Sequence, residues 1–366
     1  MKKYLILSLL LIIVNSIMAQ YSTYPIDATD PSFDESYNQT ARDTIYIQGD
    51  VNGERNNIYF KDITGAPNNS DGYTYIVNKS NIPVVINGTT TSGGGNGFCI
   101  VFRNCTNFVL TSSTNTSDPY GIKLYTKKNG AYTDGISFDG KCHDFIIENI
   151  EIYGDPNDIL VSSNNTAGIY INDPLPYYHV GGGGCAPQNI FERWGNYIDL
   201  STNIFTEGYF IENVILRNNY IHDVGKEGMY IGHSYPYQYS TLTCGQTSYK
   251  IFWAELKNIQ VYGNITENTG ATGIKISNDS LGIVIHDNVI KNYGLKDGMN
   301  NAGIFIGGGT FQASVYNNWI ENGTGEGIGS KSSYDINIFN NVIKDAGNVP
   351  NTDDGHGIYI NWYSEN

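Results

Sequence analysis

The feature that most constrains the fold is a short line of residues that recurs along the second half of the chain with its polar and apolar positions in phase. The copies read VILRNNYIHDVG, IQVYGNITENTG, IVIHDNVIKNYG, SVYNNWIENGTG and INIFNNVIKDAG, and a weaker copy, FIIENIEIYG, places Asn149 in the same register. The repeat is a unit of about 23 residues with insertions. The asparagines that the full copies align are 45, 24, 30 and 23 residues apart: Asn219, Asn264, Asn288, Asn318 and Asn341.

A second piece follows each copy and has the pattern glycine, aliphatic, any residue, aliphatic. Each unit therefore holds two short alternating strands separated by Gly and Asn turns, and such strands bury an apolar face only when units stack. Helical periodicity is nearly absent, and a propeller blade needs about forty residues. The pattern begins at Gly135, Gly168, Gly228, Gly273, Gly303, Gly327 and Gly357.

These repeats predict an all-β, single-stranded right-handed parallel β-helix in which the aligned asparagines bond along the stack. The sequence resembles the right-handed β-helix repeat family of the pectate-lyase-like superfamily from about Gly135 to Asn366, and weakly from Ile45. The resemblance implies the fold but no single function, since lyases, glycosidases, epimerases and adhesins share these repeats. The chain ends just after a strand, without a polar cap, so we expect it to be truncated at its C-terminus.

The N-terminus has the pattern of an export signal: two lysines, an apolar run too short to span a bilayer, and Ala19 before the cut. We expect a signal peptide over 1–19, an N-terminal segment over 20–44 and one β-helix domain over 45–366. No second apolar stretch is long enough to span a membrane. The mature protein should be secreted or periplasmic, and monomeric.

Charge narrows the choice of partner. The chain has 21 basic and 36 acidic residues, a net charge of −15, and loss of Lys2 and Lys3 with the signal peptide gives 19 − 36 = −17. Binding to phosphates needs a basic field, so nucleic acid is disfavoured. The same charge disfavours a strongly anionic glycan unless Ca²⁺ or local lysines offset it. A polysaccharide is the expected partner.

Strand alternation separates the two faces of the glycine-initiated strands. Pairs such as Ile274 and Ile276 should point inward, so the residues between them should face solvent as a strip about 30 Å long at ~4.8 Å per strand. Its aromatic rings suit stacking on sugar rings, although aromatic residues also favour strands for packing reasons alone. The outward column is Ser137, Tyr170, Tyr230, Lys275, Phe305, Gly329 and Tyr359, with Lys331 beside it.

Two long insertions, 173–209 and 233–256, follow glycine-initiated strands and should rise along one edge of this strip. Both are rich in aromatic residues, including Trp194 and Trp253, and each carries one cysteine, Cys185 and Cys244. In an exported chain we expect these two cysteines to be bonded or close. Two further cysteines, Cys105 and Cys142, occupy equivalent places before a phenylalanine and should be neighbours in successive turns. No CxxC pattern supports a thiolate metal site.

Lys275 is the candidate base of an eliminating lyase, with Glu227 or His233 as its proton partner, provided that its pKa is lowered. A solvated lysine with no chemical role is the simpler interpretation. A lyase must also neutralise a carboxylate, and Arg193 or Ca²⁺ could do so.

Hydrolysis is the competing chemistry, because a pair of carboxylates at suitable spacing can cleave a glycosidic bond. Asp353 and Asp354 precede His356, and the His-Gly-Ile strand there is similar to one in polygalacturonase-type hydrolases, whose other motifs are missing. The two aspartates could equally bind Ca²⁺ or solvate a turn. The sequence thus predicts a lyase or glycosidase acting on a glycan bound along the β-helix, or else a non-catalytic carbohydrate-binding or surface adhesin protein.

Overall fold

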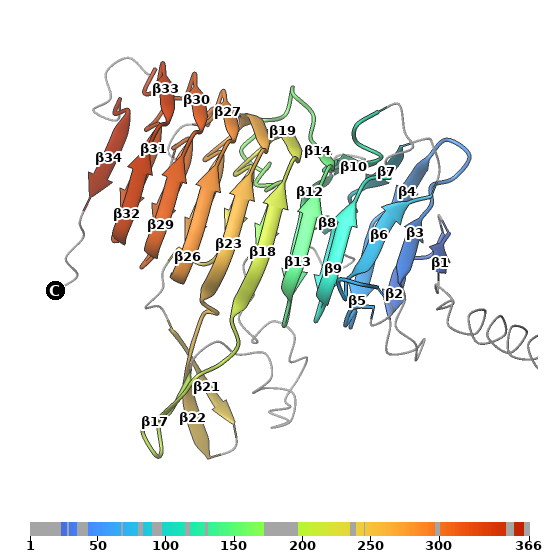
Figure 1. Cartoon of the computed structure of the whole chain (residues 1–366), viewed down its shortest axis with the longest axis horizontal. Coiled ribbons are helices and arrows are strands. Elements are labelled where there is room, and N and C mark those ends of the chain that lie inside the picture. The colour runs from blue at the N-terminus through green and yellow to red at the C-terminus, as the bar shows by residue number, and fades with distance from the viewer. Residues whose placement is uncertain are drawn as a thin grey trace, which may run out of the picture.

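The structure is a computed structural model, and it describes residues 23–361 except 28, 35–42, 67–68, 80–82, 90–96, 114–117, 129–130, 172–196, 235–238, 245, 297–300 and 349–354. The described residues form strands and turns and no helix. Most strands stack into three parallel sheets that wind along one long axis as a right-handed β-helix (Figure 1). The predicted fold class is confirmed. In the same part of the chain, no helix has the length and apolar character needed to cross a bilayer.

Sheet 1 has ten described strands and covers one side of the coil. In spatial order they are β1 (Thr23–Ile26), β3 (Thr44–Ile47), β6 (Thr74–Asn78), β9 (Thr106–Thr111), β13 (His143–Glu148), β18 (Ile211–Arg217), β23 (Leu256–Tyr262), β26 (Asp279–His286), β29 (Phe311–Tyr316) and β32 (Tyr334–Phe339).

Sheet 2 has nine described strands, most of them short. They are β4 (Glu54–Asn56), β7 (Val84–Asn87), β10 (Ile122–Tyr125), β14 (Glu151–Tyr153), β19 (Tyr220–Val224), β24 (Ile265–Thr269), β27 (Val289–Lys291), β30 (Trp319–Glu321) and β33 (Val342–Lys344).

Sheet 3 contains the glycine-initiated strands and so carries the predicted strip. Its strands are β2 (Ser32–Asp34), β5 (Ile58–Lys61), β8 (Gly97–Arg103), β12 (Ala131–Asp139), β15 (Ile169–Ile171), β20 (Met229–Ile231), β25 (Ile274–Ser277), β28 (Ile304–Gly307), β31 (Ile328–Lys331) and β34 (Ile358–Asn361), and the short β11 (Lys127–Lys128) pairs antiparallel with β12.

Each repeat holds three strands rather than the predicted two. The line that starts at Val214 folds as β18 and then β19, because Asn218 has a φ of 55° and turns the chain between them. Asparagine adopts this left-handed conformation at little cost, which explains why Asn218 precedes the ladder residue Asn219 at this corner.

The core of the coil is a stack of aliphatic side chains. The inward residues of β15, β20, β25 and β28 are fully buried, as alternation predicts: Ile169, Ile171, Met229, Ile231, Ile274, Ile276, Ile304 and Ile306 are each 0% exposed. In β34, the last described strand of sheet 3, Ile358 and Ile360 are 50% and 71% exposed because only one neighbouring strand covers them.

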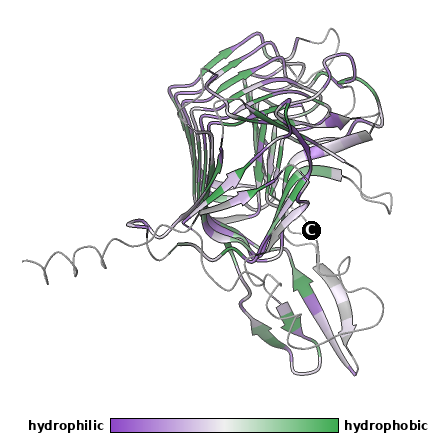
Figure 2. Ribbon diagram, turned by 90° about the vertical axis from the view of Figure 1, so that its right-hand side faces the viewer, coloured by the Kyte–Doolittle hydropathy of each residue, from purple (hydrophilic) through white to green (hydrophobic). Residues whose placement is uncertain are grey.

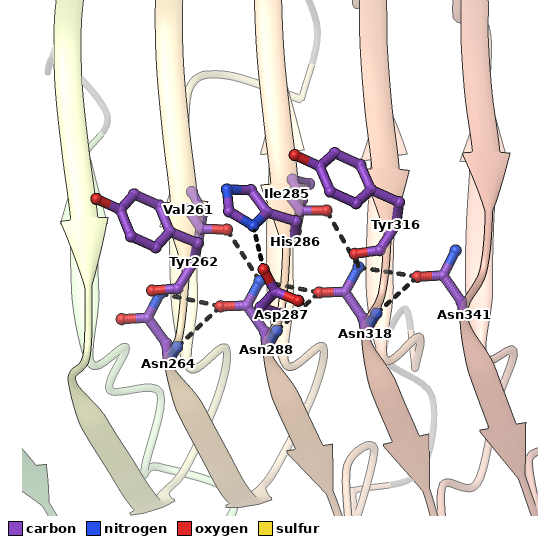
Figure 3. A network of polar contacts seen from close by, with 10 residues as sticks. All are labelled: Val261, Tyr262, Asn264, Ile285, His286, Asp287, Asn288, Tyr316, Asn318 and Asn341. Atoms are coloured by element: carbon purple, nitrogen blue, oxygen red, sulfur yellow. Dashed lines mark hydrogen bonds and ion pairs between the residues drawn. The ribbon is translucent and has the colours of Figure 1, made fainter.

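The predicted asparagine ladder is present at the corner between sheets 1 and 2 (Figure 3). The Asn264 amide donates to Asn288 Oδ1 at 3.0 Å, and that of Asn288 donates to Asn318 Oδ1 at 3.0 Å. Each amide also donates to a backbone carbonyl of the preceding turn, such as Val261 O at 2.9 Å from Asn288 Nδ2. The ladder therefore bonds each turn to both of its neighbours without water.

Asn149 does not belong to this ladder, so its predicted register was wrong. The pairing of Glu148 with Arg217 aligns Asn149 with Asn218, the residue of positive φ, and Ile150 takes the place of Asn219. The ladder ends there, where Asn219 Oδ1 accepts a bond from the backbone N–H of Ile150 at 3.3 Å.

Two shorter ladders run along the stack at other positions, and the sequence analysis did not foresee them. Their members are residues of positive φ: Asn258 bonds Asn213 and Asn213 bonds Asp144, while Asn292 bonds Asn268 and Asn268 bonds Asp223.

The two long insertions contribute to a four-stranded antiparallel sheet that projects from the coil, here called the arm (Figures 1 and 2). It consists of β16 (Tyr197–Asp199), β17 (Ile204–Thr206), β21 (Tyr239–Cys244) and β22 (Thr247–Phe252). We expected loops at this edge, and the structure instead makes a sheet whose strands come from both insertions. Antiparallel pairing among the named strands occurs only in the arm and between β11 and β12.

Replacing one ladder asparagine should destabilise the fold far more than replacing an exposed asparagine of a nearby strand. Asn288→Ala leaves the buried N–H groups of Asn264 without their acceptor, at a cost of about 3 kcal/mol. The free energy of unfolding in urea measures this loss. Asn337→Ala on the exposed face of β32 is the control and should change it by less than about 0.5 kcal/mol. Equal losses in the two variants would contradict a structural role for the ladder.

Candidate functional site

The outward residues of sheet 3 form one continuous column, here called the outer column. Strand pairing aligns Tyr170 with Tyr230, Tyr230 with Lys275, Lys275 with Phe305, Phe305 with Gly329 and Gly329 with Tyr359. The alternation of inward and outward residues in the sequence predicted the same order. Their role in binding or catalysis remains a prediction.

The centre of the outer column is covered, so the prediction that these residues face solvent was wrong. Tyr230, Lys275 and Phe305 are 8%, 6% and 8% exposed. The side chains cover one another: the Lys275 ammonium lies 4.5 Å from the centre of the Tyr230 ring and 5.8 Å from that of Phe305. The two rings therefore bracket a cation rather than present an open row of faces to a sugar.

Glycine makes room for this packing. A methyl group at Gly307 would lie 2.4 Å from a carbon of the Phe305 ring, and one at Gly329 would lie 3.2 Å from another. The ring therefore folds over two backbone segments that have no side chain. On the side of Lys275 toward the N-terminus, the ring centres of Tyr170 and Tyr230 lie 5.2 Å apart.

Glu227 stands beside Lys275 and is also buried. It directly precedes Gly228, at the start of the glycine-initiated strand, and it is 4% exposed. Its Oε1 lies 3.9 Å from Lys275 Nζ, and its Oε2 lies 3.7 Å from Lys226 Nζ. Both distances exceed that of a hydrogen bond, and Oε2 has no hydrogen-bond partner. The structure thus brings two of the predicted catalytic residues together as a loosely paired, buried acid and base.

The surroundings of Lys275 make its ammonium group easier to deprotonate. Burial lowers the pKa of Lys275 below its ordinary value; the Glu227 carboxylate opposes this shift, and the ammonium groups of Lys226 and Lys331 add to it. A lysine base needs a lowered pKa to accept a proton near neutrality, so the direction fits that role.

Asp134 is a buried acid near this pair, and the sequence analysis missed it. It precedes Gly135 as Glu227 precedes Gly228, which is the sequence signal that could have found it. It is 8% exposed, and its Oδ1 accepts a hydrogen bond from the N–H of Ala167 at 2.8 Å. Burial is the largest cause that raises the pKa of Asp134 to about 7.

The base of the arm meets the outer column beside Tyr230. The Tyr230 hydroxyl shares a hydrogen bond of 2.7 Å with Ser234 Oγ. The next residue back, His233, stacks on Trp253 with ring centres 3.8 Å apart and planes 10° apart. The Nε1 of Trp253 is buried without a hydrogen-bond partner. His233 and Trp253 thus form an aromatic pair at the edge of the outer column.

The remaining predicted site residues are scattered or lie outside the described residues. His356 lies just before β34, the last described strand of sheet 3, and stacks on Tyr359 of that strand at 5.3 Å, three strands from Lys275. Lys331 Nζ lies 5.8 Å from the centre of the Phe305 ring. The residues outside the described part are Arg193, Trp194, Asp353, Asp354 and Cys185.

No group of three or more possible metal ligands occurs among the residues that the structure describes. The described residues therefore offer no set of side chains to support the predicted Ca²⁺ site. Cys105 and Cys142 do lie in neighbouring turns and are not joined by a disulfide, with the N–H of Cys105 3.4 Å from Cys142 Sγ. The predicted contact of Cys185 with Cys244 lies outside the described residues.

Comparison with known proteins agrees with the fold. Residues 204–366 match the family model described as right handed beta helix region. A search of the curated proteins finds no match. A solved structure of a GH136 lacto-N-biosidase from Eubacterium ramulus is similar, with 9% identity and a TM-score of 0.51 over 91% of this chain; the chain spans only 57% of that one.

Two further solved structures are similar at lower scores. An alginate lyase from Paenibacillus sp. str. FPU-7 has 12% identity and a TM-score of 0.44, with 93% of this chain and 99% of that one covered. The Streptococcus pneumoniae surface protein and adhesin PfbA has 13% identity and a TM-score of 0.30, with 87% and 92% covered. At these identities the likeness concerns the fold alone. Its repeats, its three parallel sheets and the family model matched over residues 204–366 agree that the chain has the right-handed parallel β-helix fold.

Proposed function

We propose that this chain is an exported, polysaccharide-active enzyme that cleaves a glycan bound along sheet 3, with Lys275 and Glu227 as its chemical centre. The observation that carries the proposal is the loose, buried pairing of these two residues on the outer face of the coil. The proposal rests on residues of this chain, because the similar solved structures share only the fold with it.

The pair is costly for the fold. Burying two charges is compensated only by close, hydrogen-bonded geometry, and here the nearest atoms are 3.9 Å apart. Two partly buried ion pairs elsewhere on the coil are tighter: Arg217 and Glu148 meet at 2.5 Å, and Lys123 and Glu151 at 2.6 Å. Buried, perturbed groups that lack a structural explanation are typical of functional sites.

The same loose geometry leaves hydrogen-bonding capacity free for a substrate. Glu227 Oε2 can accept a bond, and Lys275 with a lowered pKa can accept or return a proton. Elimination at a uronate would use Lys275 as the base and Glu227 or His233 as its proton partner. Hydrolysis would use Glu227 as the acid or base, opposite a second carboxyl group.

The arm would wall one side of the bound glycan. The hydrogen bond from Tyr230 to Ser234 ties the base of the arm to the outer column, and Trp253 lies at that base, stacked on His233. Tyr170, Phe305, Lys331 and Tyr359 would extend contact along the coil. Export by the predicted signal peptide would bring the site to extracellular polysaccharide.

A non-catalytic carbohydrate-binding or adhesin function is the second candidate. The observation that favours it is the low exposure of Lys275 and Glu227, 6% and 4%, which limits the access of a reacting bond to them. In that case the pair would only fix the rings of the outer column, and the arm with the exposed ends of the column would hold the glycan.

Lys275→Met should separate catalysis from binding. Methionine keeps the volume between the two rings but cannot carry a proton, so turnover should fall by about 100-fold or more while glycan retention persists. Turnover is followed over a panel of polysaccharides by absorbance of unsaturated uronates and by reducing ends, which distinguishes elimination from hydrolysis. Lys291→Met on sheet 2, whose lysine pairs with Glu321 at 3.3 Å, is the matched control and should leave turnover unchanged. Full activity in the Lys275 variant would remove this residue from the mechanism, and a wild-type chain that cleaves none of the glycans would favour the adhesin function.

Tyr230→Ala should weaken retention of the glycan in affinity electrophoresis by about tenfold, because it removes a ring at the centre of the outer column and frees Ser234. Tyr262→Ala is the control: this tyrosine stacks on His286 on the outer face of sheet 1, away from the proposed site. Equal weakening in both variants would indicate a general loss of structure, and unchanged retention in the Tyr230 variant would contradict binding along sheet 3.

A further inference from the structure

An ion pair lies on the outer face of sheet 3, on the N-terminal side of the proposed site. In β8 and β12 the inward residues Phe102 and Phe138 are 0% and 5% exposed, so Arg103 and Asp139, which follow them, face outward. Strand pairing places these two residues side by side, and Arg103 Nε donates a hydrogen bond to Asp139 Oδ2 at 2.5 Å. Arg103 was not among the predicted site residues.

The guanidinium group of Arg103 keeps two nitrogen atoms for a ligand. In the part of the chain that the structure describes, the arginines are Arg55, Arg103 and Arg217. Arg55 donates through both of its Nη atoms to backbone carbonyls, and Arg217 Nη1 donates to the Tyr262 hydroxyl at 2.9 Å. Of these three, only Arg103 bonds through Nε alone. Its Nη1 and Nη2 therefore form an edge of donors that no described residue uses.

The surroundings of Arg103 hold this edge in place. Asp62 N donates to Arg103 O at 2.9 Å, and Asn104 N donates to Asp139 O at 3.0 Å, so backbone bonds fix both members of the pair. The guanidinium carbon lies 6.0 Å from the centre of the Tyr59 ring, and the side chain of Arg103 is 29% exposed. The donors are thus both positioned and reachable, which lowers the entropic cost of binding a ligand.

The pair lies along the same face as Lys275. Strand pairing continues the outer column from Tyr170 through Ser137 to Val101, and Arg103 is the next outward residue after Val101 in β8. Four strand steps separate β8 from β25, which carries Lys275. At about 4.8 Å per step, Arg103 and Lys275 start from backbone positions roughly 19 Å apart. One linear glycan along sheet 3 would therefore reach both residues.

The charges around Arg103 favour a neutral ligand group. Asp139 compensates the charge of Arg103, and the neighbouring Lys61 pairs with Asp62 at 3.1 Å. The chain as a whole carries a net charge of −15. Because this cluster has no excess of positive charge, it does not attract an anion by its field. Two parallel N–H donors instead suit two neighbouring oxygen atoms of an uncharged sugar.

We propose that Arg103 forms a distal subsite on sheet 3, in which Nη1 and Nη2 donate to adjacent hydroxyl oxygens of a neutral sugar unit. Asp139 is a positioning residue that holds the guanidinium group through Nε. The inference rests on the proposed function, and it adds a substrate class: a linear glycan long enough to extend from Lys275 to Arg103, with an uncharged unit at the distal end.

Chemical labelling tests the donor edge without a glycan. The reagent p-hydroxyphenylglyoxal reacts with the Nη atoms of arginine, and mass spectrometry of the whole labelled chain gives the rate at each residue. Arg217 is a matched internal control: its Nε also bonds a carboxylate at 2.5 Å, and its side chain is 34% exposed, but its Nη1 is occupied. Arg103 should react about fivefold faster, since no hydrogen bond has to break. Equal rates would overturn the proposal.

Affinity electrophoresis tests the subsite itself, in gels that contain laminarin or xyloglucan as neutral glycans and alginate or polygalacturonate as acidic ones. Arg103→Met should weaken retention by a neutral glycan about tenfold, because two hydrogen bonds are lost. Arg217→Met removes an equivalent ion pair from sheet 1 and should leave retention unchanged. Equal weakening in both variants would overturn the subsite, since it would reflect a general loss of structure.

Arg103→Lys tests the class of ligand, because lysine keeps the charge but lacks the planar pair of donors. It should bind a neutral glycan as weakly as Arg103→Met does. Full retention in Arg103→Lys, seen with the acidic glycans only, would overturn the neutral class.

The same gels separate this subsite from the proposed function. If Tyr230→Ala weakens retention and Arg103→Met does not, the glycan binds along sheet 3 without the distal subsite, and only this inference fails. A wild-type chain that none of the four glycans retains would count against the proposed function and the subsite together.

Discussion

The amide of each ladder asparagine closes a corner of the coil by bonding to the turn before it and the turn after it. Asn264 and Asn288 are 0% and 1% exposed, yet their side-chain donors and acceptors are met by other asparagines and by backbone carbonyls. A buried polar group is tolerated only when it is satisfied, so each amide requires the next one in register. The ladder thereby fixes where each strand of sheet 1 ends and the next strand of sheet 2 begins. The glycine of the next sheet 3 strand follows nine residues after Asn219, Asn264 and Asn318.

That fixed register converts positions that are far apart in sequence into neighbours on sheet 3. Tyr230, Lys275 and Phe305 come from three successive turns, and strand pairing places them side by side. The inward Ile274 and Ile276 on either side of Lys275 anchor its backbone in the core. The Lys275 side chain therefore points outward and packs between the rings of Tyr230 and Phe305. A rigid scaffold of this kind holds an acid and a base without a direct hydrogen bond between them, which is the arrangement that the proposed chemistry needs.

The insertions interrupt the repeat only after β15 and β20, so the coil itself is undisturbed. Their described parts pair with each other as the arm, and the contacts at its base, the hydrogen bond of Tyr230 with Ser234 and the stack of His233 on Trp253, join it to the centre of the outer column. The corner on the other side of sheet 3 carries Asp134, Lys226 and Glu227. The proposed site therefore lies between two edges of sheet 3. The aromatic edge follows β20 and carries His233 and Trp253, and the ionisable edge precedes β20 and carries Lys226 and Glu227.

The sequence by itself determined the fold, the inward isoleucines and the order of the outer column, because these depend on the period of the strands and on spacing between asparagines. It also pointed to Glu227 and Lys275 as a pair. It did not determine that Asn149 misses the ladder, since one residue of register is invisible until the strands pair. It could not show that Lys275 is 6% exposed or that Asp134 is buried, because alternation gives the side of a strand and not what covers it. Burial at the centre of sheet 3 was decided by tertiary structure alone, because the rings of neighbouring turns cover Lys275 and the Phe305 ring packs over two glycines.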